Sequence, residues 1–321
     1  MAKPKYRIRV GISMGDPSGI GPEILAKALD KLRGLADFVV IGDGGVINKL
    51  KNKTRNSQKF ILIDLKNVEI KKFKFGKISP EYGKAAYEYL KKAADLLKYK
   101  QIDCLVTCPV SKEAINLSGI KNFYGQTEFL AKSFKVKDAV MMLLNDRLKF
   151  SLLTRHTPLA QVPRQLKRRR IAKTIEITYA SLEKLFSIKN PRLVVCGLNP
   201  HASDNGLIGN EENRIIKPEL ENLKKKYKFL YGPLSSDVAI LKAYQKQFDC
   251  VIAMYHDQAL IPLKLSSQYT GINITLGLPF VRTSPLHGTA FDLAGRNCAD
   301  PRGLIEAIKL ACRCTSSLKK N

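Results

Sequence analysis

Three of the four histidines lie just past apolar runs that are typical of buried strands. His156 comes after Lys149–Thr154, His201 after Arg192–Gly197 and His256 after Phe248–Ala253. Strands of a parallel α/β sheet end at one ligand crevice, so the three imidazoles could converge. Three neutral imidazoles with an open coordination position form a catalytic rather than a structural zinc-type site. We therefore predict one divalent metal ion on these histidines, although a single histidine is more often an ordinary polar or core residue.

Anion-binding and acid–base candidates lie close to the same strands. Lys264, Asn273 and Arg282 fall at or near strand ends. Arg can hold a phosphate or carboxylate through two parallel hydrogen bonds and Lys acts as a point charge. The alternative for both is ordinary surface charge. Asp237 is either a helix cap or a carboxylate that faces the site, and it competes with Lys264 for the role of general base.

The glycine-rich turn Ser13–Glu23, SMGDPSGIGPE, is a weaker signal. It matches neither GxGxxG nor GxxxxGK, the two common nucleotide-binding loops. A strand-to-helix glycine turn often reflects only close packing. Asp16 and Glu23 are weak candidates for site carboxylates, and His287 lies outside the histidine pattern.

The elements that must position these residues alternate between strands and helices. The runs Asp37–Gly42, Ile102–Thr107 and Gly271–Leu276 predict strands, and Pro80 opens a long amphipathic helix with Ser79 as its cap. Strands 139–144 and 149–154 are joined by a tight turn, which predicts an antiparallel hairpin and hence a mixed sheet. We further expect Thr127 to cap a helix, one helix from Pro163 to Leu185, a loop over 232–237 and a last helix over 302–314.

Composition limits the class of protein. The chain has 321 residues, 45% of them hydrophobic, and seven cysteines without a CxxC pair. No apolar run reaches the length of a membrane span, and the basic start has no apolar segment of a signal peptide. These features predict a soluble cytoplasmic protein with free, mostly buried thiols and no contact with membranes.

The net charge of +27 leaves two interpretations. Nucleic-acid binders gather Lys and Arg in one stripe or tail, whereas here they are spread along the chain. The densest runs, Lys167–Arg170 and Lys224–Lys228, lie in polar segments that resemble helices. Solvated helix faces are favoured over nucleic-acid binding, and a positive surface also steers anionic substrates toward a site.

Eight segments together resemble one enzyme family. They are GDPSGIGPE, TCPVSK, GQTEFLA, RHTPL, LNPHASDNGLIGNEE, GPLSSD, MYHDQALIPLK and NITLGLPFVRTSPLHGTAFDLAG. In order and spacing they are similar to the 4-hydroxythreonine-4-phosphate dehydrogenases of pyridoxal phosphate biosynthesis, over almost the whole chain.

This resemblance implies an α/β fold of the isocitrate/isopropylmalate-dehydrogenase type, with two interleaved α/β/α domains and a mixed sheet. The domains would be 1–128 with 285–321, and 129–284. It also implies a homodimer with shared active sites, and NAD (or NADP) bound without a Rossmann fingerprint. The family's metal ligands fall on His156, His201 and His256, the last contributed by the partner subunit. Its substrate contacts fall on Gln126, Thr127, Lys264, Asn273 and Arg282, with Gln126 standing where most relatives have histidine.

The implied reaction is NAD- and metal-dependent oxidation and decarboxylation of 4-phosphooxy-L-threonine to 3-amino-2-oxopropyl phosphate. Three imidazoles favour zinc, and cobalt, nickel, manganese or magnesium could also support the chemistry. One alternative is a dehydrogenase of 4-phospho-D-threonate or 4-phospho-erythronate. Another is a non-redox metal-dependent hydrolase or phosphotransacylase, which would turn over without NAD.

Overall fold

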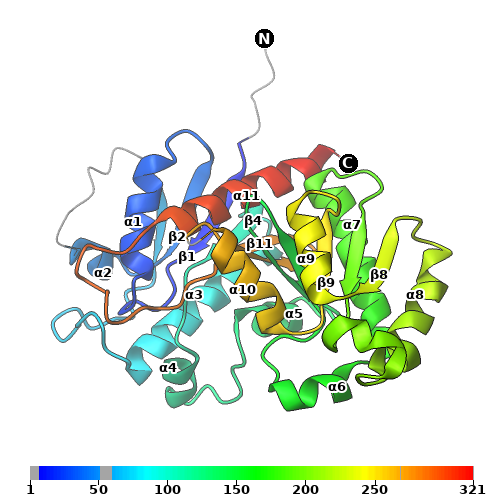
Figure 1. The fold of residues 1–321 in the computed structure, drawn as a ribbon. Helices are drawn as coiled ribbons and strands as arrows, with labels where there is room; N and C mark the ends of the chain where they lie inside the picture. Colours follow the sequence, from blue (N-terminus) through cyan, green and yellow to red (C-terminus); the bar gives the residue numbers. More distant parts are fainter. Residues whose placement is uncertain (1–6, 51–59, 268, 321) are drawn as a thin grey trace, which may run out of the picture. The chain divides into compact units, whose positions relative to one another are not determined.

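The computed structural model describes residues 7–50, 60–267 and 269–320. These residues form two compact units (Figure 1). Unit 1 combines the described residues up to Lys137 with Leu278–Lys320, and unit 2 is Asp138–Gly277. Unit 2 is therefore inserted into unit 1, and the sequence-based boundaries lie at 128/129 and 284/285.

Unit 1 is built on parallel strands. In chain order it contains β1 (Arg9–Ser13), α1 (Gly21–Lys31), β2 (Asp37–Gly42), α2 (Gly44–Asn48), β3 (Ile61–Asp64), α3 (Pro80–Lys98), β4 (Cys104–Thr107), α4 (Lys112–Leu117), α5 (Gln126–Ser133), β11 (Val281–Pro285) and α11 (Arg302–Lys320). Its strand order is β3-β2-β1-β4-β11, and each neighbouring pair is parallel. Strands buried on both faces need continuous apolar runs, as in β2, DFVVIG, where five of six residues are buried.

Helices cover both faces of this sheet. On β11, Thr283 donates a hydrogen bond to the carbonyl of Ala307 in α11, at 2.8 Å. Successive strand side chains point to opposite faces, so the preceding residue, Arg282, faces the side that carries α5. Its guanidinium contacts Thr127 of that helix. The alternation along one short strand thus directs one polar side chain to each face.

Unit 2 has a mixed sheet. It contains β5 (Val140–Leu144), β6 (Lys149–Leu152), α6 (Val162–Gln165), α7 (Arg168–Phe186), β7 (Leu193–Cys196), α8 (Lys217–Lys224), β8 (Leu230–Leu234), α9 (Ser236–Tyr244), β9 (Cys250–Ala253), α10 (His256–Ser266) and β10 (Ile272–Leu276), with single turns of 3-10 helix at Leu159–Gln161, of helix-like turn at Pro200–Gly206 and of π-helix at Glu212–Ile216. The strand order is β10-β5-β6-β9-β7-β8. β5 pairs antiparallel with β10 and β6, which confirms the predicted hairpin, and the pairs from β6 through β8 are parallel.

The predicted mixed α/β fold is confirmed, and several predicted elements are wrong. Strand β8 includes residues 232–234, where a loop was expected. Strand β11 lies within 277–292, a segment for which no element was predicted. The helix expected from Pro163 to Leu185 is divided into α6 and α7, and α11 continues past Cys314 to Lys320. Ser79 is the N-cap residue of α3, as predicted, but its side chain makes no capping hydrogen bond. Helix α5 begins at Gln126 with Gly125 as its N-cap, so Thr127 is not a cap.

Two of the compositional expectations can be compared with the structure. Among the described residues, no helix is both long and apolar enough to cross a membrane. All seven cysteines are free thiols, and six of them are buried; Cys298 is exposed.

Candidate functional site

The three strand-end histidines lie along one edge of unit 2. Strands β6, β9 and β7 are neighbours and parallel, so their carboxyl ends share this edge. His156 follows β6, His256 is the first residue of α10 after β9, and His201 lies in the turn after β7. The strand arrangement expected for convergence is therefore present.

His156 and His256 form a close pair within one chain. Their ring centroids are 5.7 Å apart, and the rings are inclined by 46°. Zinc–nitrogen bonds of about 2.1 Å and tetrahedral angles place the centroids of two imidazoles on one ion roughly 5–6 Å apart. The Nδ1 of His256 is 2.7 Å from a carboxylate oxygen of Asp257, an outer partner typical of metal-ligating histidines, which leaves Nε2 for the ion. The separation of the two rings is thus compatible with metal ligation at this edge, whereas the family resemblance assigns His256 to the metal site of the partner subunit.

His201 lies on an unusual turn. Residues His201–Asn205 all have positive φ, from 43° to 71°. This left-handed conformation costs roughly 1–2 kcal/mol for each residue with a side chain, and such strain clusters at functional sites. In the described ranges, no three His, Cys, Asp or Glu side chains lie close enough to hold a metal ion. His201 is thus on the same sheet edge as the pair without completing a three-residue cluster.

A buried glutamate that the sequence reasoning missed supports this turn. Glu212 is fully buried, and its Oε1 accepts hydrogen bonds from the amides of Leu198 and Asn199 at 2.7 and 2.8 Å. Its Oε2 accepts from the side chain of Asn199 at 2.9 Å. The EE pair in the quoted motif LNPHASDNGLIGNEE was a signal in the sequence, but it did not show which carboxylate turns back to the strand end.

Asp237 lies in the first turn of α9 and is exposed. The hydrogen bond from Ser235 lowers the pKa of its carboxyl below the ordinary value, with smaller contributions from the amide of Val238 and the charge of His201. A general base works best with a pKa near the working pH. Asp237 is therefore better suited to accept hydrogen bonds than to store a proton.

The other two unit 2 candidates are placed differently. Lys264 is exposed on α10, eight residues after His256, which corresponds to about 12 Å along a helix axis. Asn273 is the second residue of β10, and its side-chain oxygen is buried without a hydrogen-bond partner. Neither is drawn into the histidine pair.

In unit 1, Arg282 and Thr127 are brought together as predicted substrate contacts. Arg282 is only 3% exposed. Its guanidinium donates hydrogen bonds to the hydroxyls of Thr107, at 2.6 Å, and Thr127, at 3.3 Å. Burial lowers the pKa of Arg282 to about 10. Thr107 ends β4 and was not singled out from the sequence, because its partner Arg282 is far away in the chain.

Gln126 lies beside this group at the start of α5. Its Nε2 donates to the carbonyl of Cys108 at 3.1 Å, and its Oε1 is buried without a hydrogen-bond partner. The amide therefore presents an unused acceptor and carries no charge. A histidine at this place could titrate, and the glutamine cannot.

The two carboxylates of the glycine-rich turn have different surroundings. Asp16 is fully buried; its Oδ1 accepts from the amide of Ser18 at 3.0 Å, and its Oδ2 has no partner. Burial raises the pKa of Asp16 from 3.8 to about 6, against the lowering effect of nearby amides. Oε1 of Glu23 accepts from the amide of Ala299 and from Lys27, and its Oε2, like Oδ2 of Asp16, is buried without a hydrogen-bond partner. Both residues remain candidate site carboxylates.

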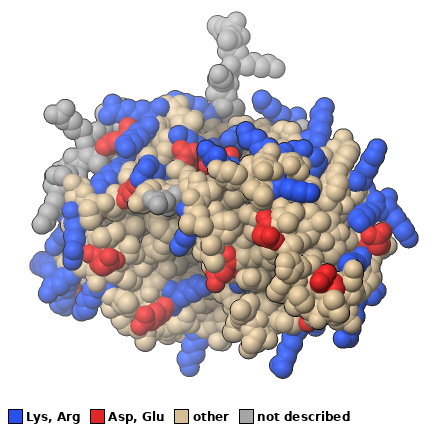
Figure 2. Space-filling view, viewed as in Figure 1, with Lys and Arg blue, Asp and Glu red and all other residues tan. Residues whose placement is uncertain are grey.

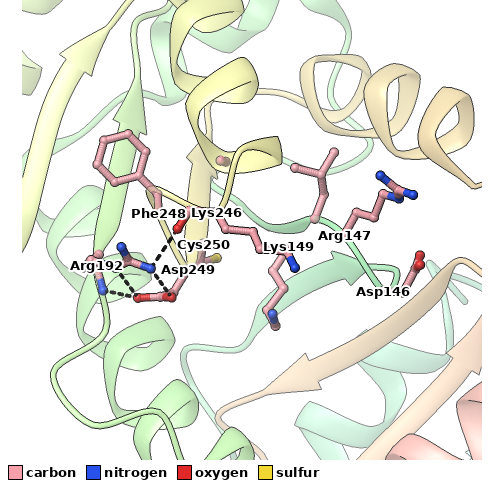
Figure 3. A pocket seen from close by; sticks show the side chains of 10 residues that line it. Asp146, Arg147, Lys149, Arg192, Lys246, Phe248, Asp249 and Cys250 are labelled. Carbon is pink, nitrogen blue, oxygen red and sulfur yellow. Dashed lines mark hydrogen bonds and ion pairs between the residues drawn. The ribbon is translucent and has the colours of Figure 1, made fainter.

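A surface pocket of about 290 Å³ in unit 2 lies at the opposite ends of the same strands. It is lined by residues that precede or begin β6, β7 and β9, including Lys149, Arg192 and Cys250. Figure 3 shows the Arg192 guanidinium held by Asp249. Arg147 is bonded to the hydroxyl of Tyr244. The charged side chains that line this pocket are therefore largely bonded to one another or to neighbouring residues. The three histidines lie at the opposite ends of the strands.

The positive charge is not organised as a nucleic-acid surface on the face seen in Figure 2. Lys and Arg are scattered over this face with Asp and Glu among them. The many short ion pairs between helix neighbours, such as Lys173 with Glu176 at 2.7 Å, agree with solvated helix faces. This distribution favours the interpretation that the charge belongs to ordinary helix surfaces.

Fold and site define an α/β protein with a histidine pair at a parallel sheet edge and a buried, hydroxyl-bonded arginine. A family model described as pyridoxal phosphate biosynthetic protein PdxA matches residues 22–311. The chain belongs to this family.

Similar proteins cover nearly all of the chain. A "4-hydroxythreonine-4-phosphate dehydrogenase" of Sulfurihydrogenibium is 41% identical and covers 95% of this chain and 97% of its own length. A "D-threonate 4-phosphate dehydrogenase" of Salmonella typhimurium is 40% identical, with 94% and 97% covered. A crystal structure of 4-hydroxythreonine-4-phosphate dehydrogenase from Klebsiella pneumoniae has a TM-score of 0.85 at 32% identity, with 98% and 99% covered. The family resemblance inferred from the motifs is confirmed, and with it the expected fold class and a dehydrogenase family.

Proposed function

We propose that this chain catalyses NAD- and divalent-metal-dependent oxidation and decarboxylation of 4-phosphooxy-L-threonine to 3-amino-2-oxopropyl phosphate. The observation that carries the proposal is the family match over residues 22–311. The histidine pair at 5.7 Å and the buried Arg282 support it, because they supply a metal-ligand set and an anion-binding group.

In this proposal, the metal ion is held by His156 and His201 of one chain and by His256 of the partner subunit, and zinc is favoured. When bound, the ion would supply Lewis acidity to a substrate hydroxyl, and a nicotinamide cofactor would supply a hydride acceptor. The chain's own groups bind and orient the substrate. Arg282 presents a charged, planar donor group to a phosphate or carboxylate. The hydroxyl of Thr127 accepts a hydrogen bond from this guanidinium and so helps to hold its orientation.

The remaining candidates have narrower roles. The free Oε1 of Gln126 can accept a hydrogen bond from a substrate hydroxyl or ammonium group. Lys264 is an exposed point charge for a phosphate. Of the two proposed bases, Asp237 has a lowered pKa, so we assign it to orienting a donor and keep Lys264 as the candidate for proton transfer.

A second substrate, 4-phospho-D-threonate, is supported by the relative from Salmonella typhimurium. It carries a hydroxyl where 4-phosphooxy-threonine carries an amino group. The two named activities occur at 40% and 41% identity to this chain, so similarity alone does not choose between them.

We also propose that the enzyme is a homodimer. Helices α9 and α10 expose large apolar side chains, among them Leu241, Ile261 and Leu265. Exposed apolar patches of this kind mark association surfaces. Sedimentation analysis should give a dimer, and the Leu265→Glu variant should shift it toward the monomer.

The deciding experiment follows NADH formation with each substrate, with and without a chelator. Chelator-sensitive turnover of 4-phosphooxy-threonine supports the proposal. Turnover of the threonate alone retains the metal and the cofactor and changes the substrate. Absence of NADH with both substrates in metal-loaded enzyme would overturn the redox proposal and leave the hydrolase or phosphotransacylase alternative.

A further inference from the structure

One buried amide side chain connects the segments that carry the unit 2 site residues. Gln258 is 7% exposed and lies in the first turn of α10, two residues after His256. Its Oε1 accepts from the amide of Met254 at 2.6 Å. Its Nε2 donates to the carbonyl of Gly197 at 3.0 Å and to the hydroxyl of Ser236 at 2.6 Å. Both hydrogens of the amide nitrogen and one lone pair of its oxygen are therefore used.

Each partner of Gln258 lies in a segment that carries a different candidate residue. Met254 directly follows β9, ahead of His256, and Gly197 directly follows β7, ahead of the turn with His201. Ser236 directly precedes Asp237 and also donates to the carbonyl of Gly197, at 3.3 Å. One side chain thus fixes the spacing of three chain segments.

The fourth segment is joined through Met254. Thr154 follows β6, two residues before His156. Both its amide and its hydroxyl donate to the carbonyl of Met254, at 3.2 and 2.7 Å. The carbonyl of Met254 thus accepts from Thr154, and its amide donates to Gln258. The segments that carry the three histidines are therefore linked by hydrogen bonds.

We infer that Gln258 is a positioning residue for the metal site, an inference that rests on the proposed metal-dependent function. It does not contact the ion. Through Met254 and Gly197 it sets the separation of the strand ends that carry His156 and His201, the two ligands from one chain. Outer groups of this kind contribute about 10–100-fold to metal affinity. Only a neutral amide supplies two donors and one acceptor here, because Glu lacks the donors and Met lacks all three groups.

The test compares Gln258→Met and Gln258→Glu with a control of similar kind. The control is Thr178→Val, which removes the buried hydrogen bond from Thr178 to Ser151 at 2.8 Å, in the same unit and on α7. All three variants should lower the urea midpoint. Zinc affinity, measured by competition with a chromophoric chelator, should weaken about 10–100-fold in both Gln258 variants and stay at the wild-type value in Thr178→Val.

A second readout is the visible absorption spectrum of the cobalt-loaded protein, which reports ligand geometry independently of turnover. It should change in the Gln258 variants and not in the control. Wild-type zinc affinity in both folded Gln258 variants would overturn the positioning role. Equal losses in the control and the Gln258 variants would assign the effect to stability alone and also overturn it. Failure of the wild-type chain to bind zinc or cobalt would instead refute the proposed metal-dependent function on which the inference rests.

Discussion

The buried carboxyl of Asp16 should make the stability of this protein depend on pH in an unusual direction. Most buried carboxylates with hydrogen-bond partners stabilise a fold as pH rises. Asp16 is fully buried with one oxygen lacking a partner, and burial raises its pKa from 3.8 to about 6. The folded chain therefore binds this proton more tightly than the unfolded chain. Its contribution is most favourable below pH 3.8 and is lost as pH rises through about 6.

The magnitude follows from the two pKa values. A tenfold change in proton affinity corresponds to about 1.4 kcal/mol, so ionised Asp16 costs about 3 kcal/mol at pH 8. At pH 4 the folded form is mostly protonated, and the same relation leaves a cost of about 0.5 kcal/mol. Asp16→Asn keeps the shape and cannot ionise. Its unpartnered amide hydrogens add a penalty that is the same at both pH values and cancels in the difference.

The assay is urea unfolding at pH 4 and pH 8, followed by far-ultraviolet circular dichroism because the chain has no Trp. The free energy of unfolding of Asp16→Asn, taken relative to wild type, should rise by about 2.5 kcal/mol between pH 4 and pH 8. Asp43→Asn is the matched control. Asp43 is buried, and both its oxygens accept from amides, those of Val46 and Val68, at 3.2 Å. At pH 8 the free energy of unfolding of Asp43→Asn should be about 1–2 kcal/mol lower than that of wild type, because the Asn side chain turns an N–H group toward one of these two backbone amides.

An Asp16→Asn variant that gains nothing between pH 4 and pH 8 would refute the assignment of a raised pKa to Asp16. A functional consequence can be measured on the same sample. Proteins that retain a costly buried charge commonly need it for activity. The stabilised variant should therefore turn over substrate more slowly than wild type at pH 8.

Further predictions concern the two groups of site residues. Arg282→Lys keeps the charge but loses the fork that bonds Thr107, so KM in steady-state kinetics should rise about 10–100-fold. Gly197→Ala would place a Cβ 2.8 Å from the Cα of Ala202, so the turn with His201 must shift and zinc affinity in a competition titration should fall. His201→Ala should abolish both turnover and the metal content measured after gel filtration; near-normal activity would contradict the metal assignment. Chelation of the wild-type enzyme should lower its melting temperature, since an ion at about 100 times its Kd adds about 2.7 kcal/mol.

Local sequence signals were sufficient to locate those strands and helices whose boundaries depend on neighbouring residues in the chain. The alternation of apolar runs located the strands that precede the histidines, and Pro80 located the start of α3. Strand β8 was missed because it contains Pro233, and proline usually argues against a strand. It is tolerated here because β8 lies at the end of the strand order in unit 2, where one side of the strand has no neighbour within that unit.

The supporting contacts could not be predicted, because they join residues far apart in the chain. Gln258 bonds Gly197 across 61 positions, and Arg282 bonds Thr107 across 175. Thr127 was interpreted as a cap because a hydroxyl near a helix start usually binds the helix amides. In the structure Gly125 precedes the helix, and the hydroxyl is engaged by Arg282 instead. Local preference was overridden by a tertiary partner.

Burial alone does not identify the functional groups of unit 1. The thiols of Cys104 and Cys108 are buried and their pKa values are raised by burial, that of Cys108 to about 12. A buried thiol remains neutral and behaves as a small apolar group, so its burial costs little. Arg282 and Asp16 differ, because each is a charge carrier whose ionised form burial disfavours, Arg282 with a lowered pKa and Asp16 with a raised one. Both side chains lie at strand ends, Arg282 beside hydroxyl groups and Asp16 in a glycine-rich turn. Packing does not require a buried charge at either place, so a role in ligand binding explains why this free-energy cost is retained.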